Sequence, residues 1–225
     1  GGLRARRDEL GRLISAGAGK PIRFASVEAA RAVDTFTEAA EQCKRLQGEY
    51  ISIEAVAGGD GRHGVVRRFP VGTVAGISPF NFPLNLASHK VAPAIAAGCS
   101  MVLKPASQTP MSALPLGELA LEAGLPPGGL NVVPADRQAA NLLTTDERIA
   151  LLTFTGSAEV GWGMKSRAGK KRVVLELGGN AAAIVGPDIE QTRTVDEVVR
   201  RLVVGAFAYA GQVCISVQRI FVLEP

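Results

Sequence analysis

Residues 71–104, VGTVAGISPFNFPLNLASHKVAPAIAAGCSMVLK, decide the fold. The stretch begins with the apolar run V-G-T-V-A-G-I, continues through a helix-length segment at 84–97, and ends with S-M-V-L-K. Short, continuous apolar runs favour strands that are buried on both faces, which is typical of parallel sheets. A strand, a helix and a second strand in this order therefore predict a parallel sheet covered by helices.

The same alternation continues toward the C-terminus. Further strands are predicted in L-N-V-V, A-L-L-T-F, R-V-V-L-E-L, A-A-I-V and Q-R-I-F-V-L. Helices are predicted at residues 109–123, 137–143, 157–168 and 195–209. Before residue 71, the periodicity predicts helices at 3–16 and at 26–46, with Ser26 as a cap, and then short extended runs around glycines up to residue 70. The sequence therefore predicts an α/β fold.

Composition excludes several classes of protein. The chain has 225 residues, enough for one large domain or two small ones, and 47% of them are hydrophobic. The net charge of +4 is scattered and forms no basic stripe with interleaved aromatics, which argues against a nucleic-acid-binding protein. The most apolar stretches, 91–103 and 202–210, are shorter than the ~20 residues of a membrane span. We expect no membrane segment and no signal peptide.

The three cysteines show no paired spacing, which indicates reduced thiols and a cytoplasmic protein rather than a disulfide framework. With two histidines and no C-x-x-C motif, a zinc site is not expected. Cys43, within a predicted helix, and Cys99, at a strand start, are interpreted as core residues, and His89 as structural. Cys214 follows a helix and the turn residue Gly211, with no cationic neighbour in sequence, so any activation of its thiol comes through space.

Unusual polar residues follow the predicted strands, where α/β sheets bind ligands. A carboxylate in an apolar strand, such as Glu176 in V-V-L-E-L-G-G, loses hydration, which favours its protonated form and suits a general base. The alternative is a strand-end Glu that reaches solvent or forms a salt bridge with Lys171 or Arg172. Asn81 lies between Pro79 and Pro83, which stiffen the loop. Its side chain is either a fixed donor to an oxyanion or a group that hydrogen-bonds to the backbone of its own turn.

Two further strand ends point to a nucleotide. Lys104 closes a strand and is either a contact to a ribose or phosphate or a lysine whose ammonium extends to solvent. Gly156 and Ser157 begin a helix, whose free N–H groups form an anion site, although serine is also an ordinary N-cap. The chain contains no G-x-G-x-x-G.

Taken together, P-F-N-F-P, V-L-K-P-A-S-Q-T-P, F-T-G-S-A-E-V-G, L-E-L-G-G-N and G-Q-V-C-I-S resemble the aldehyde dehydrogenase superfamily, in the family's order. The resemblance implies a Rossmann-like NAD(P)-binding domain at 1–210 and the beginning of a second, catalytic α/β domain at 211–225. Family members are longer, so the resemblance implies a chain truncated just after the cysteine. Such a chain is expected to bind dinucleotide weakly and to turn over poorly, and the longer protein to be a homodimer or homotetramer.

The resemblance also implies roles for residues. Cys214 matches the nucleophile that attacks the aldehyde, and the Asn81 side chain and Cys214 N–H match the oxyanion hole. Hydride transfer to nicotinamide then leaves a thioester, which water activated by Glu176 hydrolyses to the acid. The residues implied to bind the cofactor are Ile77, Ser78, Pro79, Phe80, Lys104, Ala106, Ser107, Gly156, Ser157 and Gly178.

One departure from the family bears on the cofactor. Position 107 is Ser, where NAD-preferring members commonly place a Glu that accepts from both ribose hydroxyls. A small neutral residue near Lys104 leaves room for a 2′-phosphate, so NADP is expected to be accepted as well as NAD. Two alternatives stay open: a catalytically weak dinucleotide-binding domain, and a relative that passes the acyl group to coenzyme A. The sequence does not identify the aldehyde.

Overall fold

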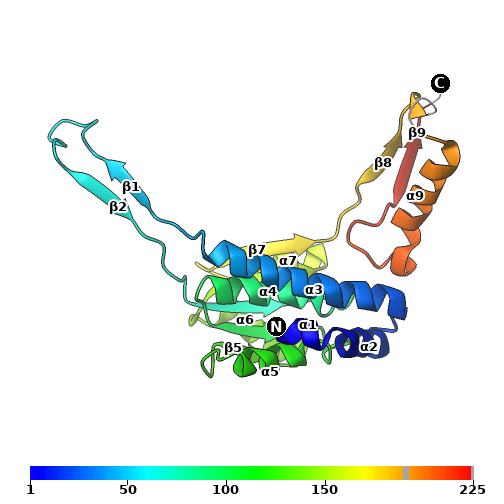
Figure 1. Ribbon diagram of the computed structural model, residues 1–225, viewed down its shortest axis with the longest axis horizontal. Coiled ribbons are helices and arrows are strands. Elements are labelled where there is room, and N and C mark those ends of the chain that lie inside the picture. The colour runs from blue at the N-terminus through cyan, green and yellow to red at the C-terminus, as the bar shows by residue number, and fades with distance from the viewer. Residues whose placement is uncertain (190–192, 224–225) are drawn as a thin grey trace.

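The computed structural model describes residues 1–189 and 193–223 (Figure 1). Five parallel strands form the central sheet in the order β5-β4-β3-β6-β7. Their bounds are β3 Thr73–Ile77, β4 Met101–Lys104, β5 Leu130–Val132, β6 Ile149–Gly156 and β7 Arg172–Leu177. The predicted parallel sheet is confirmed, and each of these strands coincides with a predicted apolar run.

Helices cover both faces of the sheet. The connecting helices are α4 Asn85–Ala96, α5 Leu114–Glu122, α6 Arg137–Thr145 and α7 Ala158–Arg167. One core joins Val74 and Met101 to α4 and α5, and a second joins Ala75 and Leu152 to α6 and α7. Because successive strand residues point to opposite faces, neighbours such as Val74 and Ala75 enter different cores. This explains why the central strands are apolar throughout rather than alternating.

Three N-terminal helices add a layer over α4: α1 Gly2–Ala5, α2 Arg7–Ala18 and α3 Ile22–Cys43. The single helix predicted at 3–16 is interrupted at Arg6. The helix predicted to begin at Ser26 begins one turn earlier, after Pro21, so Ser26 is not its cap. Gly19 ends α2 with φ of 62°, a left-handed conformation that glycine adopts without steric cost, and this turns the chain back toward α3.

The interpretation of Cys43 as a core residue is wrong, because its side chain is exposed at the last residue of α3. The buried residues of α3 all lie between Ala25 and Ala32, and Phe36 packs against the same core, so only the last turns of the helix extend past it. Cys99 is buried, as predicted. The apolar spacing in α3 continues beyond the part of the helix that has neighbours to pack against.

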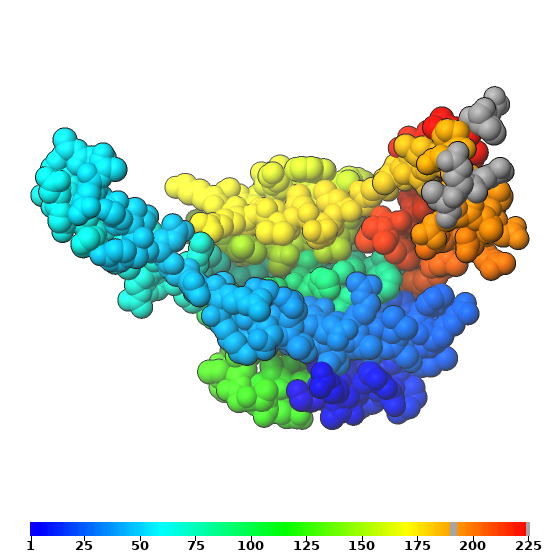
Figure 2. Space-filling model, turned by 45° about the horizontal axis from the view of Figure 1, so that its top comes forward, coloured from blue at the N-terminus to red at the C-terminus, as the bar shows by residue number. Residues whose placement is uncertain are grey.

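Two units project from opposite ends of the central body (Figures 1 and 2). The first is an antiparallel hairpin of β1 Glu49–Ser52 and β2 His63–Val66, which confirms the extended runs predicted there. The second consists of β8 Ala182–Val185, α9 Val195–Phe207, the 3₁₀ turn η1 Ala208–Gly211 and β9 Arg219–Val222. β8 and β9 are both predicted strands, but they pair with each other in a separate parallel sheet.

Within residues 1–189 and 193–223, no helix combines the length and the apolarity that a membrane span requires.

Candidate active site

The strand order reverses beside β3, and we call the region at the carboxyl ends of the strands on its two sides the crevice. From β3 the chain moves outward to β4 and β5, and it then returns to the other side of β3 to form β6. Ligands of open α/β sheets bind where the strand order reverses in this way. Ile77 ends β3 and is aligned with both Lys104 on β4 and Phe154 on β6. The predicted cofactor residues that follow these strands therefore lie at neighbouring strand ends.

Lys104 is held at one side of this crevice. Its side chain is buried, and its ammonium donates to the Ser107 hydroxyl at 3.1 Å. Burial lowers the pKa of Lys104 from its ordinary value, Asp136 opposes this effect, and Arg137 adds to it. Only 7% of the residue is exposed, so most of its stem lies inside the protein. Ala106 is partly exposed in the same loop.

The turn from β6 to α7 presents the beginning of a helix to the crevice. Ser157 occupies the N-cap with φ of −69° and ψ of 148°, but its side chain forms no capping hydrogen bond, so it is not an ordinary cap. A Cβ on Gly156 would lie 2.5 Å from the Phe154 ring, which requires a glycine there. The helix therefore starts with N–H groups that no side chain of the N-cap occupies, as an anion site requires.

The loop after β3 contributes a buried hydroxyl. Ser78 is 3% exposed, and within the described part of the chain its Oγ has no hydrogen-bond partner. Buried hydroxyls are rarely left without a partner, so such a group at a crevice fits a polar ligand. Pro79 is half-buried and Phe80 is 39% exposed next to it. Together with Lys104 and the start of α7, these residues fit a dinucleotide.

Asn81 connects this loop to the C-terminal unit. Its Nδ2 donates to the carbonyl of Gln212 at 2.9 Å, and its Oδ1 accepts from the Phe82 N–H at 3.1 Å. The second bond is the local contact that we considered as an alternative, whereas the first crosses to a segment 131 residues away. The structure therefore brings the carboxamide to the loop that contains Cys214.

Cys214 is a free, exposed thiol in a turn after η1. The turn is held by two contacts of Ser216, whose N–H donates to the Val213 carbonyl and whose hydroxyl donates to the Ala206 carbonyl. Upstream of it, Tyr209 and Ala210 have φ of 51° and 54°, a left-handed conformation that is strained for residues with a side chain. These contacts give the cysteine loop a defined shape next to Asn81.

Glu176 is exposed, so the expectation of a carboxylate dehydrated within the strand is wrong. The reason is that β7 is the last strand of its sheet, and α4, the helix on the face that carries Glu176, packs mainly on β3 and β4. Its suggested partners, Lys171 and Arg172, form no ion pair with it in the part of the chain that the structure describes. Nor does a hydrogen bond join Glu176 to Asn81 or Cys214 there. Gly178 is exposed just after β7.

Lys90, which no sequence pattern above singled out, interacts electrostatically with Glu176. Lys90 lies on α4, is 6% exposed and donates to the hydroxyls of Thr153 and Thr155 at 3.1 and 2.8 Å. Thr155 is aligned with Glu176 across the sheet. Burial lowers the pKa of Lys90 to about 8, and Glu176 opposes this effect. A lysine among the small, apolar residues of a helix was the sequence feature that indicated a buried cation.

The position of Lys90 predicts a pH-dependent stability. Below about pH 8 its burial as a cation costs about 3 kcal/mol, since the unfolded-state pKa is 10.5. Between about pH 8 and pH 10.5 the unfolded state binds more protons, so the free energy of unfolding rises with pH. Lys90→Met should remove this rise in urea unfolding series, whereas Lys165→Met, which removes an exposed lysine, should retain it. An equal rise in Lys90→Met would contradict the assignment.

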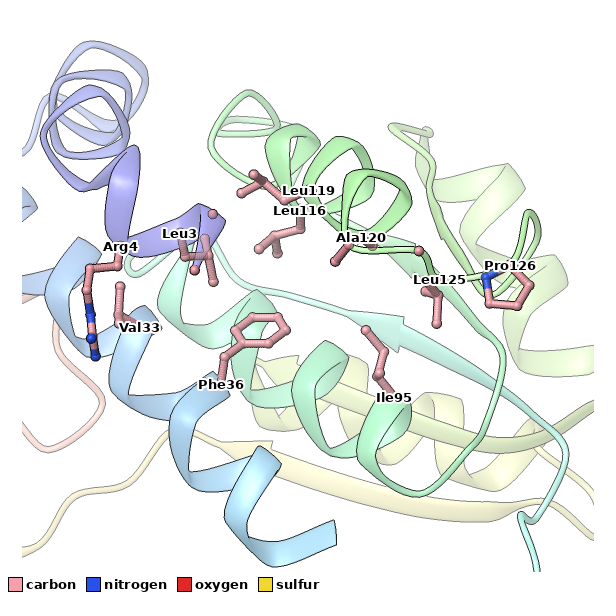
Figure 3. A pocket seen from close by; sticks show the side chains of 14 residues that line it. Leu3, Arg4, Val33, Phe36, Ile95, Leu116, Leu119, Ala120, Leu125 and Pro126 are labelled. Atoms are coloured by element: carbon pink, nitrogen blue, oxygen red, sulfur yellow. The ribbon is translucent and has the colours of Figure 1, made fainter. Parts of the chain in front are cut away.

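The described residues also enclose an apolar cavity of about 530 Å³ between α1, α3, α4 and α5 (Figure 3). Leu3, Phe36, Ile95 and Leu116 point into it from these four helices. None of the predicted site residues lines this cavity. It is therefore separate from the crevice at the strand ends.

Comparison with known proteins gives a family match over most of the chain. Residues 2–225 match the family described as "Aldehyde dehydrogenase family". The chain is 43% identical over 221 residues to 3-sulfolactaldehyde dehydrogenase of Priestia aryabhattai, covering 98% of this chain and 46% of that protein. It is 42% identical over 221 residues to succinate-semialdehyde dehydrogenase [NADP(+)] GabD of Escherichia coli, covering 97% and 44%.

A solved structure agrees with this match. The crystal structure of aldehyde dehydrogenase 21 from Physcomitrella patens, in complex with the reaction product succinate, superposes with a TM-score of 0.92 at 48% identity. The superposition covers 98% of this chain and 45% of that one. The chain thus spans a little less than half the length of the relatives that it matches.

Proposed function

Because the chain belongs to the aldehyde dehydrogenase family, we propose that it takes part in the NAD(P)-dependent oxidation of an aldehyde to a carboxylic acid, with Cys214 as the nucleophile. The observation that carries this proposal is the hydrogen bond of 2.9 Å between Asn81 Nδ2 and the Gln212 carbonyl. It connects a fixed amide donor to the loop of an exposed thiol, and acyl transfer to a thiol requires these two groups near each other.

In the proposed reaction, the Cys214 thiolate adds to the aldehyde carbonyl and forms a C–S bond. The Asn81 amide and the Cys214 N–H donate to the oxygen that becomes negative in this step. When bound, NAD(P)⁺ supplies the acceptor for the hydride that leaves the substrate carbon. The resulting thioester is hydrolysed by a water from which Glu176 removes a proton. The exposure of Glu176 is compatible with this role, because the carboxylate must reach a water molecule.

For the cofactor, we propose that Lys104 and Ser107 bind the adenosine ribose and that Gly156 and Ser157 bind the pyrophosphate. The remaining contacts to the dinucleotide are proposed to come from Ile77, Ser78, Pro79, Phe80, Ala106 and Gly178. The lysine–serine contact of 3.1 Å and the uncapped start of α7 support these roles. Ser107 is exposed and uncharged, which favours acceptance of NADP.

A charge at position 107 should change the cofactor preference. In Ser107→Glu, a carboxylate repels the 2′-phosphate of NADP and accepts from the two free hydroxyls of NAD. We expect the ratio of the NADP to the NAD affinity to fall by roughly 100-fold. Titration of NADPH and of NADH, followed by the fluorescence of the reduced nicotinamide, measures both affinities without turnover. Ser107→Gln, of similar size but neutral, should change the ratio much less, and a large NAD preference in the parent chain would contradict the proposal.

We also propose that the dinucleotide-binding domain spans residues 1–210, that a catalytic domain begins at 211–225, and that the protein is a cytoplasmic homo-oligomer. The three cysteines are free, which is compatible with a reducing compartment. Self-association is supported by apolar side chains on the projecting β1–β2 hairpin, where Tyr50 and Val65 are each 69% exposed.

The test uses the chain in excess over substrate, so that a single turnover is detected. A panel of aldehydes that includes succinate semialdehyde is added with NADP or NAD, and formation of the reduced dinucleotide is followed by fluorescence. The proposal predicts a signal with at least one aldehyde and release of the carboxylic acid without coenzyme A. Absence of reduced dinucleotide with every aldehyde would refute the oxidation. Product release only with coenzyme A would instead show an acyl-transferring relative.

A further inference from the structure

A buried ion pair that the proposed reaction does not use lies beneath the Asn81 loop. Lys20 follows the end of α2 and Glu28 lies in the first half of α3, and both side chains are fully buried. The distance from Lys20 Nζ to Glu28 Oε2 is 2.5 Å. Buried pairs contribute little to stability on balance, because removing two charges from water offsets their attraction. The location of such a pair therefore calls for another explanation.

The pair holds the segment that carries the Asn81 carboxamide at both of its ends. Lys20 Nζ donates a second hydrogen bond, of 2.6 Å, to the Asn81 carbonyl. The other oxygen of Glu28, Oε1, accepts from the N–H groups of Leu84 and Asn85, at 2.9 and 3.2 Å, where α4 begins. The backbone between Asn81 and Asn85 is thus fixed by one ammonium and one carboxylate.

The same ammonium contacts the segment that leads to Cys214. Lys20 Nζ lies 3.8 Å from the centroid of the Phe82 ring and 4.4 Å from that of the Tyr209 ring. The two rings meet edge to face with centroids 6.3 Å apart. Tyr209 is also tied to the end of α2, because its hydroxyl donates to the Ala18 carbonyl at 3.1 Å. Tyr209 lies at the start of the left-handed pair of residues before Cys214.

We propose that Lys20 and Glu28 are positioning residues, which hold the Asn81 amide and the Cys214 loop in their mutual arrangement. This inference rests on the proposed function for its catalytic meaning, although the arrangement itself is measurable without catalysis. The Lys20 ammonium contacts both segments, since it donates to the Asn81 carbonyl and lies over the Phe82 and Tyr209 rings. Its burial strengthens the contacts to the rings, because cation–π contacts are stronger when the cation is desolvated. Burial lowers the pKa of Lys20, and Glu28 opposes this effect by hydrogen bonding and charge.

The double variant Lys20→Met/Glu28→Gln separates positioning from stability. Met fills a similar volume but donates no hydrogen bond to Asn81 and places no charge over the rings. Gln retains an oxygen for the Leu84 and Asn85 N–H groups, so α4 keeps its start. Since a buried pair is often replaced without loss of the fold, the variant is expected to remain folded. Lys20→Gln/Glu28→Gln, which leaves no unpaired charge and keeps a polar group at both positions, carries the same readouts if the first double variant does not fold.

Two readouts report on the arrangement directly. In a Cys43→Ser background, which removes the other exposed thiol, the alkylation rate of Cys214 by iodoacetamide should change roughly fivefold or more in the double variant. Amide exchange should accelerate at 80–85 and 207–214, and more at these segments than in the central sheet. Ile14→Ala is the matched control, because it removes a buried side chain from the α2–α3 layer and is hydrogen-bonded to neither loop. It should lower stability without these localised changes.

Single-turnover oxidation adds the catalytic readout. The double variant should react about tenfold more slowly with aldehyde, whereas its affinity for NADP should remain that of the parent. Unchanged exchange and alkylation would overturn the positioning inference, even if oxidation by the parent is observed. Localised changes in both, in a parent that oxidises no aldehyde, would support the positioning inference while refuting the proposed function.

Discussion

Replacement of Cys214 by serine is expected to lower aldehyde-dependent formation of reduced dinucleotide by at least about 10³-fold, because a serine hydroxyl is a poor nucleophile near neutral pH without a base beside it. Among the described residues, the Cys214 side chain has no hydrogen-bond partner and is exposed, so the substitution removes reactivity without removing a structural contact. Its effect on the free energy of unfolding should stay within about 0.5 kcal/mol.

The measurement is single-turnover fluorescence of the reduced dinucleotide, accompanied by dinucleotide binding and thermal unfolding. Cys43→Ser is the matched control, since it removes an exposed thiol at the end of α3, far along the chain from the site. This control should retain the parent rate. A Cys214→Ser variant that keeps more than about a tenth of the parent rate would rule out the covalent mechanism, because the thiol is then dispensable.

Glu176→Gln is expected to separate the two halves of the reaction. Oxidation should still yield one equivalent of reduced dinucleotide per chain, but release of the acid should slow by roughly 10² to 10⁴-fold, the usual contribution of a general base. The acyl group should then remain on Cys214, where mass spectrometry of the intact chain detects the added mass. Gln has the shape of Glu, and Glu176 makes no hydrogen bond within the described residues, so the fold should be unaffected.

The control for this experiment is Glu159→Gln, which neutralises an exposed carboxylate in the first turn of α7. It should release the acid at the parent rate. If Glu176→Gln releases acid as fast as the parent chain, a different group activates water. If the variant forms no reduced dinucleotide at all, Glu176 is needed before the thioester forms, and its assignment to thioester hydrolysis alone is incorrect.

The alternation of strands and helices was predictable because each central strand is buried on both faces and is therefore apolar throughout. Which strands belong to the same sheet was harder to predict from the sequence. The run A-A-I-V reads like the other strands, yet it forms β8 and pairs with β9 outside the main sheet. The same limitation explains why the exposure of Glu176 was not predicted, since no local pattern shows that β7 is the last strand of its sheet. Which strands are neighbours is decided by contacts between distant segments.

Within the site, residue types at strand ends were predictable, but their partners were not. The position of Asn81 between two prolines indicated a fixed carboxamide, whereas its bond to Gln212 spans 131 residues. Buried cations were the main omission. Lys20 reads as an ordinary surface lysine, because Asn81, whose carbonyl accepts from it, lies 61 residues away. The small, apolar residues around Lys90 are a local signal of burial, but its partner Thr155 lies 65 residues away. Sequence patterns reveal buried positions through the spacing of apolar residues. A polar pair inside the core does not follow this spacing, so its burial is not predicted.

The hydrogen bond from Tyr209 to Ala18 joins residues 191 positions apart, almost from one end of the chain to the other. Closing so long a loop costs conformational entropy, and contacts between residues far apart in sequence slow folding. This hydrogen bond holds the first residue of the left-handed pair before Cys214, so a distant segment as well as the local sequence supports the shape of this turn. A chain whose first two helices have not docked therefore lacks one of the contacts that hold the Cys214 loop.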